Sequence, residues 1–216
     1  MTLRSVVTAL GLAAALALAG CTTGSEGTGP ANQIFTSEYG SVTDAGYTIP
    51  AVPISQIDKR YHRQIVNYRT AEKPGTIIVD TPKRFLYYVL PGGKAVRYGI
   101  GVGREGFAWQ GNAYIAWKQA WPKWTPPKEM VERQPKLRKY AEDGQPGGLT
   151  NPLGARALYL FNEEGQDTLF RLHGTPEWKS IGTAASSGYI RLMNQDIIDL
   201  YERVRPGKQA KVIVKQ

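Results

Sequence analysis

The segment RLHGTPEWKSIGTAASSGYIRLMN, residues 171–194, carries the two chemically distinctive blocks of this chain. The first block is His173-Gly174-Thr175, which ends a run of β-forming residues and so falls at the end of an expected strand. The second block is Ser186-Ser187-Gly188-Tyr189-Ile190-Arg191. A lone histidine is most often structural, so chemistry at His173 requires that the fold bring the second block beside it.

Short runs of β-forming residues, separated by turn residues, lie on both sides of this segment. They predict strands at 76–79, 84–89, 95–100, 157–161, 168–172 and 211–214. The spacing of Ile197, Ile198, Tyr201 and Val204 predicts one helix, capped by Asn194. Many short strands with few helices predict a mainly β sandwich or barrel with one or two short helices.

The composition restricts the cofactor chemistry. The chain of 216 residues has one cysteine and two histidines, His62 and His173. A single cysteine excludes an internal disulfide, a cysteine-rich zinc site and an iron–sulfur cluster, and two histidines leave little room for a metal centre. We therefore expect no cofactor and no metal. The net charge is +9, and residues 74–216, with 21 basic and 13 acidic side chains, account for +8 of it.

Two further patterns have simple interpretations. Gly101–Gly106 matches G-x-G-x-x-G, but the residues that follow do not predict the helix that a dinucleotide fingerprint requires. Four tryptophans precede a basic stretch, which is one pattern of single-stranded nucleic-acid binding: Trp109, Trp117, Trp121 and Trp124, then residues 128–139. An exported protein rarely meets nucleic acid, so we expect no nucleic-acid partner. Aromatic residues at this density favour core packing, with a groove wall for a glycan or peptide as the alternative.

The N-terminus predicts export. Arg4 precedes an apolar run at 6–19, which is shorter than the roughly 20 residues that a membrane-spanning helix needs and fits a signal peptide. The run ends in Leu18-Ala19-Gly20-Cys21, which resembles the bacterial lipobox, where the cysteine is lipidated. We expect a periplasmic protein, lipid-anchored at Cys21. Thr22 in place of Asp favours the outer membrane. The alternative is an ordinary signal peptide with a chance cysteine.

The sequence divides into three parts. Residues 1–20 are the expected signal peptide. Residues 21–73 combine a small, polar tether with an extension (34–73) that we expect to be weakly structured and to pack on the main domain. Residues 74–216 form the expected catalytic-type domain.

The two blocks, with several others in the same order, resemble the L,D-transpeptidase family, the YkuD-type catalytic domain of bacterial cell-wall enzymes. The resemblance covers most of 74–216. Its further blocks are Gly111-Asn112-Ala113, Trp121-Pro122 with Trp124-Thr125-Pro126-Pro127, Gly147-Gly148, Asn151-Pro152-Leu153-Gly154-Ala155-Arg156, and Asn194 with Asp196-Ile197-Ile198-Asp199-Leu200-Tyr201. It implies a β-sandwich-like domain with the active site on one sheet.

The resemblance also implies a reaction. In the family, a cysteine attacks the peptide carbonyl of diaminopimelate in a peptidoglycan stem, the terminal D-Ala leaves, and an amine takes the acyl group. A neighbouring histidine favours the thiolate, and backbone N–H groups stabilise the oxyanion. In this chain, His173 matches the catalytic histidine. Ser187, Gly188 and Arg191 match residues that flank the nucleophile and bind substrate or the oxyanion.

The nucleophile position itself is occupied by Tyr189, and Cys21 belongs to the lipobox. A phenol has a pKa near 10, against about 8.5 for a thiol. Its oxygen also lies much further from the backbone than a cysteine sulfur would. A misplacement of about 1 Å can cost about 100-fold in rate. We therefore expect a pseudoenzyme, a member of an acyltransferase family with impaired catalysis.

Three functions remain open from the sequence. The chain is a lipoprotein that binds peptidoglycan stem peptides without catalysis, or an active transpeptidase or peptidase that uses His173 with Tyr189 or water, or a lipoprotein that binds a protein partner. We predict that His173, Tyr189 and Arg191 line a common groove. This requires the His173 ring to lie within roughly 10 Å of Tyr189.

Overall fold

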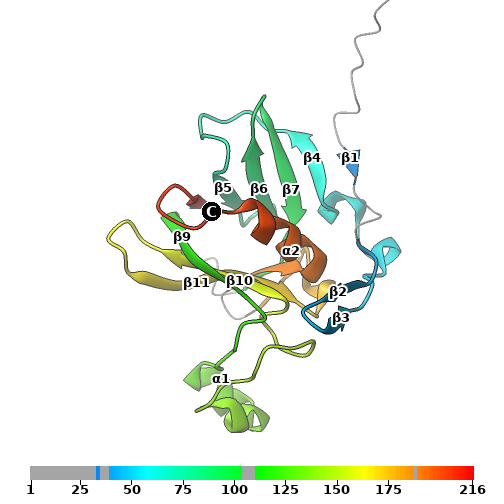
Figure 1. The fold of residues 1–216 in the computed structure, drawn as a ribbon, viewed down its shortest axis with the longest axis vertical. Coiled ribbons are helices and arrows are strands. Elements are labelled where there is room, and N and C mark those ends of the chain that lie inside the picture. Colours follow the sequence, from blue (N-terminus) through cyan, green and yellow to red (C-terminus); the bar gives the residue numbers. More distant parts are fainter. Residues whose placement is uncertain (1–32, 35–38, 104–109, 187–188) are drawn as a thin grey trace, which may run out of the picture.

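A computed structural model describes residues 33–34, 39–103, 110–186 and 189–216. Its main feature is a sheet of ten strands in the described ranges, in the order β1-β4-β7-β6-β5-β14-β9-β10-β11-β13 (Figure 1). The strands are β1 Gln33–Ile34, β4 Gln64–Asn67, β5 Ile77–Asp80, β6 Phe85–Leu90, β7 Lys94–Gly99, β9 Gly111–Ala120, β10 Arg156–Phe161, β11 Asp167–Thr175, β13 Ile190–Met193 and β14 Lys211–Lys215. The predicted mainly β class is confirmed.

The remaining elements are short. Two small sheets pair β2 Val42–Asp44 with β3 Tyr47–Ile49, and β8 Val102–Gly103 with β12 Ala184–Ser186. The helices are α1 Lys128–Arg133 and α2 Asn194–Arg203. Single 3₁₀ turns occur at Ile54–Gln56, Lys59–Tyr61 and Trp178–Ser180, and a longer 3₁₀ helix spans Pro135–Tyr140.

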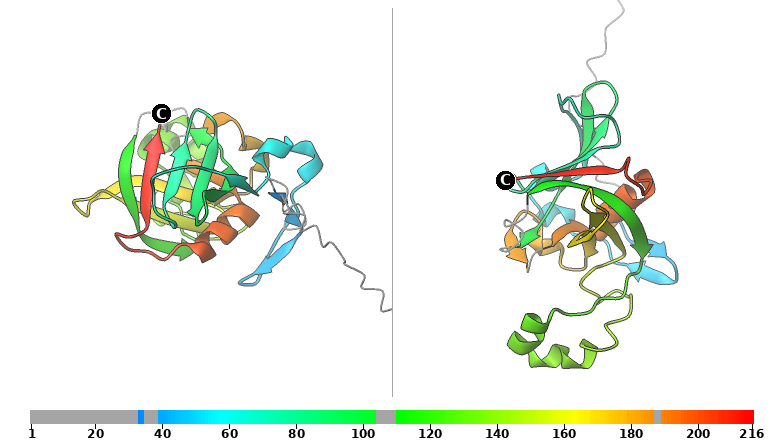
Figure 2. Two further views of the ribbon diagram at one scale, coloured as in Figure 1. Left: turned by 90° about the horizontal axis from the view of Figure 1, so that it is seen from above. Right: turned by 90° about the vertical axis from the view of Figure 1, so that its left-hand side faces the viewer.

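The main sheet is strongly bent, as the two views of Figure 2 show, and its strands share a large hydrophobic core. Its two halves contribute to the same buried cluster, with Ile77 and Tyr98 from one half and Ile115, Leu158 and Leu172 from the other. The helix α2 closes the core through Ile197, Leu200 and Val204, as the sequence spacing predicts. A side-chain period of two lets one face of each strand join the core while the other faces solvent or a smaller cluster.

The six predicted strands are all present, with bounds within one residue except that β11 runs to Thr175, three residues beyond its predicted end. Strands β1, β4, β9 and β13 of the main sheet were not predicted, and β9 is the longest of these. Its ten residues place only Ala113 and Ile115 in the core. Trp117 and its polar neighbours lie outside the core, so the strand has little of the alternation by which a strand is recognised. Its identity as a strand comes from its pairing with β10 and β14.

The expectation that Asn194 caps α2 is wrong. The N-cap residue is Met193, with no side-chain cap hydrogen bond, and Asn194 is already helical. Its Oδ1 instead accepts a hydrogen bond from the backbone N–H of Ala155 at 2.9 Å. The side chain therefore joins two distant segments instead of satisfying its own helix.

The expectation of weak structure for residues 34–73 is also wrong. Strand β4 pairs with β7 in the main sheet, and Tyr39 and Ile49 are buried. Asp44 accepts two hydrogen bonds from the Arg156 guanidinium, at 2.7 and 2.8 Å, and a third from the Trp121 indole at 2.7 Å. This paired guanidinium lowers the pKa of Asp44. The composition of the extension is mixed, and its order depends on these contacts with the domain.

A buried polar contact holds the extension against α2. The Tyr39 hydroxyl accepts a hydrogen bond from the Arg63 backbone N–H at 2.6 Å and donates one to Asp196 Oδ2 at 3.2 Å. The Arg63 guanidinium lies 3.7 Å from Asp196 Oδ1. The Arg63 N–H and the Asp196 carboxyl are both buried, so each needs the Tyr39 hydroxyl as a hydrogen-bond partner.

We predict that Tyr39→Phe lowers the free energy of unfolding by about 2 kcal/mol, because it leaves the Arg63 N–H and the Asp196 carboxyl without this partner. Urea denaturation of the variant measures the loss. Tyr68→Phe is the matched control, because no hydrogen bond joins the Tyr68 hydroxyl to a described residue. Equal changes in the two variants would contradict a role for the buried contact.

Candidate active site

The parallel pairing of β11 with β13 brings the two distinctive blocks together. In this register His173 is the partner of Arg191, and Thr175 is the partner of Met193. Partner residues of adjacent strands project from the same face, so His173 and Arg191 lie side by side. Tyr189 immediately precedes β13 and reaches the same place. Sequence reasoning could match the two blocks to a family, but only strand pairing supplies the contact.

Close packing of Gly154, Gly174 and Asn194 explains why the Pro-Leu-Gly and His-Gly-Thr blocks each contain a glycine. Asn194 Oδ1 lies against Gly154 and Gly174, where an added Cβ would clash with it. At Gly174 a Cβ would also meet Ile197 Cγ2 at 2.8 Å. Gly154 has φ +62°, in the left-handed region that favours glycine. The Pro-Leu-Gly and His-Gly-Thr blocks are thus packed against the start of α2, directly behind His173.

The side chain of His173 is held as a neutral base. Its Nδ1 lies 2.6 Å from the carbonyl oxygen of Gly174, and because a carbonyl only accepts, Nδ1 carries the proton. Its Nε2 is buried and has no hydrogen-bond partner in the described structure. Burial lowers the pKa of His173 from 6.5 to about 3, assisted by the positive charge of Arg191. The unprotonated Nε2 therefore has its lone pair available at neutral pH.

Tyr189 packs directly on this histidine. The ring centroids are 5.6 Å apart with planes at 88°, an edge-to-face arrangement. The tyrosine is partly buried. The expectation that the His173 ring lies within roughly 10 Å of Tyr189 is confirmed.

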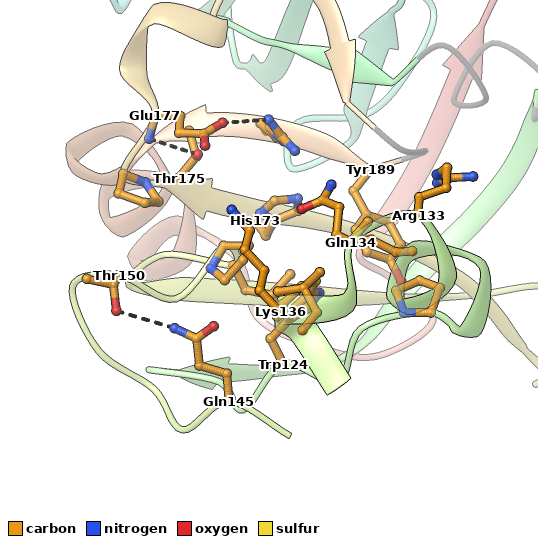
Figure 3. Close-up of a pocket in the computed structure, with 17 residues that line it drawn as sticks. Trp124, Arg133, Gln134, Lys136, Gln145, Thr150, His173, Thr175, Glu177 and Tyr189 are labelled. Atoms are coloured by element: carbon orange, nitrogen blue, oxygen red, sulfur yellow. Dashed lines mark hydrogen bonds and ion pairs between the residues drawn. The ribbon is translucent and has the colours of Figure 1, made fainter. Parts of the chain in front are cut away.

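Both rings line a pocket with a volume of about 450 Å³, which also reaches Arg191 (Figure 3). Trp124 forms part of its wall and is itself buried. The predicted common groove for His173, Tyr189 and Arg191 is therefore present. Its volume lies within the range of small-molecule sites.

Arg191 is held by two different partners. Its backbone exchanges hydrogen bonds with Gly101, both at 2.9 Å. Its Nη1 lies 3.3 Å from Glu177 Oε2, while its Nε is buried without a hydrogen-bond partner in the described ranges. Burial lowers the pKa of the guanidinium, which stays charged over the ordinary pH range. One exposed carboxylate therefore satisfies only part of this cation.

The other expected features have mixed outcomes. Ser187, Gly188 and Cys21 lie outside the described residues, as does Trp109. Of the remaining tryptophans, Trp124 is buried as expected. Trp117 is 42% exposed and stacks on Tyr159 with centroids 3.4 Å apart, so the core expectation is wrong for Trp117. Gly101 is explained by packing, because an added Cβ would lie 2.6 Å from the Ser180 carbonyl oxygen.

Several pocket residues were not predicted: Met130, Arg133, Lys136, Leu137 and Glu177. The first four belong to the basic stretch after the tryptophans, and charge was the only indication that the sequence offered. In the described ranges, no group of three or more histidine, cysteine or acidic side chains could hold a metal ion. No helix among the residues with a described placement is long and apolar enough to cross a membrane.

Comparison with known proteins identifies the class. The sequence model of the L,D-transpeptidase catalytic domain (YkuD) matches residues 74–214. The chain belongs to this family.

Particular relatives are similar over the same region. The probable L,D-transpeptidase YcfS of Escherichia coli (strain K12) is 33% identical over 145 residues, which are 63% of this chain and 43% of that protein. The probable L,D-transpeptidase ErfK/SrfK of the same organism is 32% identical over 146 residues, with the same coverage. The chain thus spans less than half the length of these relatives.

One solved structure is similar over most of both chains. It is described as a probable carnitine operon oxidoreductase, CaiA, from Brucella melitensis. It is 46% identical, with a TM-score of 0.50, and the match covers 72% of this chain and 96% of that one.

The depressed pKa of His173 predicts a dependence of stability on pH. In the unfolded chain the imidazole takes up a proton near pH 6.5, while in the folded groove it resists protonation to about pH 3. The unfolded state thus binds more protons in this window, and the contribution of His173 to stability falls as the pH falls through it. Burial raises the pKa of Asp196, which acts in the opposite direction, so a variant comparison is needed.

We predict that the difference in unfolding free energy between the parent and His173→Gln becomes less favourable to the parent by about 2–3 kcal/mol from pH 7 to pH 4.5. Urea denaturation across this range measures it. Lys179→Gln, an exposed change close by, keeps a constant difference. A constant difference for His173→Gln as well would show that the imidazole titrates alike in both states.

Proposed function

We propose that this chain is a lipoprotein of the bacterial cell envelope that binds peptidoglycan stem peptides in the groove at His173, without cysteine-dependent acyl transfer. The observation that carries the proposal is Tyr189. It stands at the nucleophile position that the family resemblance assigns, its ring packs on the matching histidine, and the one cysteine of the chain is Cys21. The groove is retained, while the thiol on which the family's chemistry depends is absent.

The groove offers what a peptide ligand needs. His173 Nε2 is a buried acceptor with no partner in the described structure, and a peptide N–H or hydroxyl would satisfy it. Arg191 is a partly buried cation at the same surface, suited to a carboxylate or a carbonyl oxygen. Trp124 supplies an apolar wall. A few polar groups at fixed positions among apolar walls are typical of a ligand site.

The same features argue against acyl transfer by Tyr189. Burial lowers the pKa of His173 to about 3, so its imidazole is a weak base and accepts a proton from a phenol only at a large cost in free energy. The ring also occupies part of the volume in which a scissile peptide bond would have to lie. Its hydroxyl is carried much further from the backbone than a thiol would be, away from backbone donors that suit a short side chain.

The anchor and location are part of the proposal. The apolar run at 6–19 and the lipobox-like residues Leu18–Cys21 support lipidation of Cys21 after export. Such an anchor would hold the groove next to the peptidoglycan layer in the periplasm, and Thr22 favours the outer membrane. The positive charge of residues 74–216 would attract polymers that carry carboxylates.

A second candidate is residual hydrolysis or transfer, with His173 as base and water or Tyr189 as nucleophile. The free lone pair of His173 Nε2 favours it. The glycine pattern 101–106 gives no support to dinucleotide chemistry, because Gly101 pairs with Arg191 and packs against Ser180.

The binding proposal predicts retention on purified sacculi. The full chain in detergent should co-sediment with sacculi and be released by a stem tetrapeptide. Arg191→Gln should weaken retention about tenfold, as expected for loss of a charge-assisted hydrogen bond. Arg205→Gln, at an exposed position outside the pocket, should change it little. Retention no greater than that of an unrelated basic protein without a lipid would refute the proposal and favour a protein partner.

The substitution Tyr189→Cys should restore reactivity. It removes the ring that packs on His173, which raises the exposure of the imidazole and returns its pKa toward the ordinary range. A thiol beside such a histidine forms a thiolate readily. Incubation with a tetrapeptide or a carbapenem, followed by intact-mass spectrometry, should show an acyl adduct on this variant.

The parent and Tyr189→Ala are the controls and should remain unmodified. An adduct on the parent at Tyr189, or release of D-Ala by the parent, would establish the second candidate in place of a silent groove. A folded Tyr189→Cys protein that reacts with neither reagent would mean that the groove no longer accepts the family's substrate.

A further inference from the structure

A small helical lobe forms one wall of the pocket. It comprises residues 127–140, with α1 and the following 3₁₀ helix Pro135–Tyr140, and it projects from the body of the sheet (Figure 1). Arg133, Gln134 and Lys136 of this lobe line the same pocket as His173 and Tyr189 (Figure 3). A ligand that fills the pocket therefore contacts this lobe.

Two cations of the lobe have no ionic partner. Neither Arg133 nor Lys136 forms an ion pair or a side-chain hydrogen bond with any described residue, although both line the pocket. Among the described lining residues, the only acidic side chain is Glu177, which is paired with Arg191 at 3.3 Å. His173 is neutral near pH 7, so this described part of the lining carries three positive charges and one negative charge.

The basic residues of the lobe divide into two groups by position. All four side chains are exposed, but Arg133 and Lys136 line the pocket while Lys128 and Arg138 do not. Arg133 and Lys136, together with the partly satisfied Arg191, give the described lining an excess of positive charge. An anionic ligand would complement this charge.

We propose that Arg133 and Lys136 form a carboxylate clamp. These two side chains bind free carboxylates of the ligand, and so make the groove selective for stem peptides whose carboxyl groups are not amidated. This inference rests on the proposed function. Stem peptides end in carboxylates, and the pocket volume admits a peptide end, with Met130 and Leu137 as its apolar wall. The Arg133 guanidinium can hold a carboxylate with two parallel hydrogen bonds, while Lys136 acts as a point charge.

The experiment compares a stem tetrapeptide that has free carboxylates with the same peptide fully amidated. Both are titrated by calorimetry into the full chain, kept in detergent, at low salt. The parent should bind the amidated peptide at least about tenfold more weakly. Arg133→Gln and Lys136→Gln should each weaken binding of the free acid about three- to fivefold, as for a partly exposed charge pair, and added salt should reduce both effects.

The matched controls are Lys128→Gln and Arg138→Gln, which remove the same charges from the same lobe outside the pocket. Their binding should stay within about twofold of the parent. We define the amidation penalty as the factor by which amidation of the peptide weakens its binding. The double variant Arg133→Gln/Lys136→Gln should lose most of this penalty, because it lacks the two side chains that distinguish a carboxylate from an amide. That coupling separates direct binding from a general change in charge or folding.

The possible outcomes distinguish the inference from the function on which it rests. If the parent binds both peptides equally, or if the double variant keeps the full amidation penalty, the clamp is refuted while stem-peptide binding stands. If control and pocket variants weaken binding equally, the effect is only long-range attraction and the clamp is again refuted. If the parent binds neither peptide, the proposed function fails and the clamp fails with it.

Discussion

The close packing of β10, β11 and the start of α2 is the constraint on which the site depends. Gly154 and Gly174 lie against Asn194, whose side-chain oxygen accepts the Ala155 N–H. No side chain larger than hydrogen fits at either glycine without displacing this contact. The junction fixes the end of β11, and with it the position of His173 beside β13. The pairing of β11 with β13 then brings Arg191 and Tyr189 into the same groove.

Burial gives the histidine its chemical character. The bond from Nδ1 to the Gly174 carbonyl selects one tautomer, and the surroundings, including the Tyr189 ring, keep the imidazole neutral. In a family that uses a thiol, a histidine beside the nucleophile takes part in proton transfer. In this chain the Tyr189 ring packs on the histidine, whose Nε2 is a buried acceptor. Under the proposed function, this local structure serves recognition in place of reaction.

Two segments, the N-terminal extension and the helical lobe, have different relations to the site. Residues 39–67 support the site from behind, through Tyr39 with Asp196 and through Asp44 with Arg156. These contacts are buried or bidentate, and they attach the extension to α2 and β10. The lobe 127–140 lies in front and contributes cations that have no partner in the described structure. One segment stabilises the groove, and the other forms the surface that a ligand meets.

Much of the fold could be predicted from residue types alone. The strands of β5 to β7, β10, β11 and β14 consist of β-forming residues between turn residues, and α2 has a clear apolar spacing. Local chemistry decides such elements, so a local pattern reveals them. Strand β9 and the lobe were missed because their residues have weak patterns. The wrong cap at Asn194 has a related cause, since the residue type suits a cap while its actual partner, Ala155, lies far away in the sequence.

The candidate site divides in the same way. The sequence by itself determined the family, the presence of Tyr189 directly after Ser187-Gly188 and the absence of a second cysteine, because these are facts of residue identity and order. Only the tertiary structure decided that His173 is neutral with a buried Nε2 that has no hydrogen-bond partner in the described structure. It also decided that Tyr189 packs on His173 edge to face, and that Arg133 and Lys136 line the pocket while Lys128 and Arg138 do not. The burial of a side chain, its tautomer and its ionic partners depend on residues that are distant in the sequence and that the fold brings together. The order of residues along the chain does not specify the distances between them.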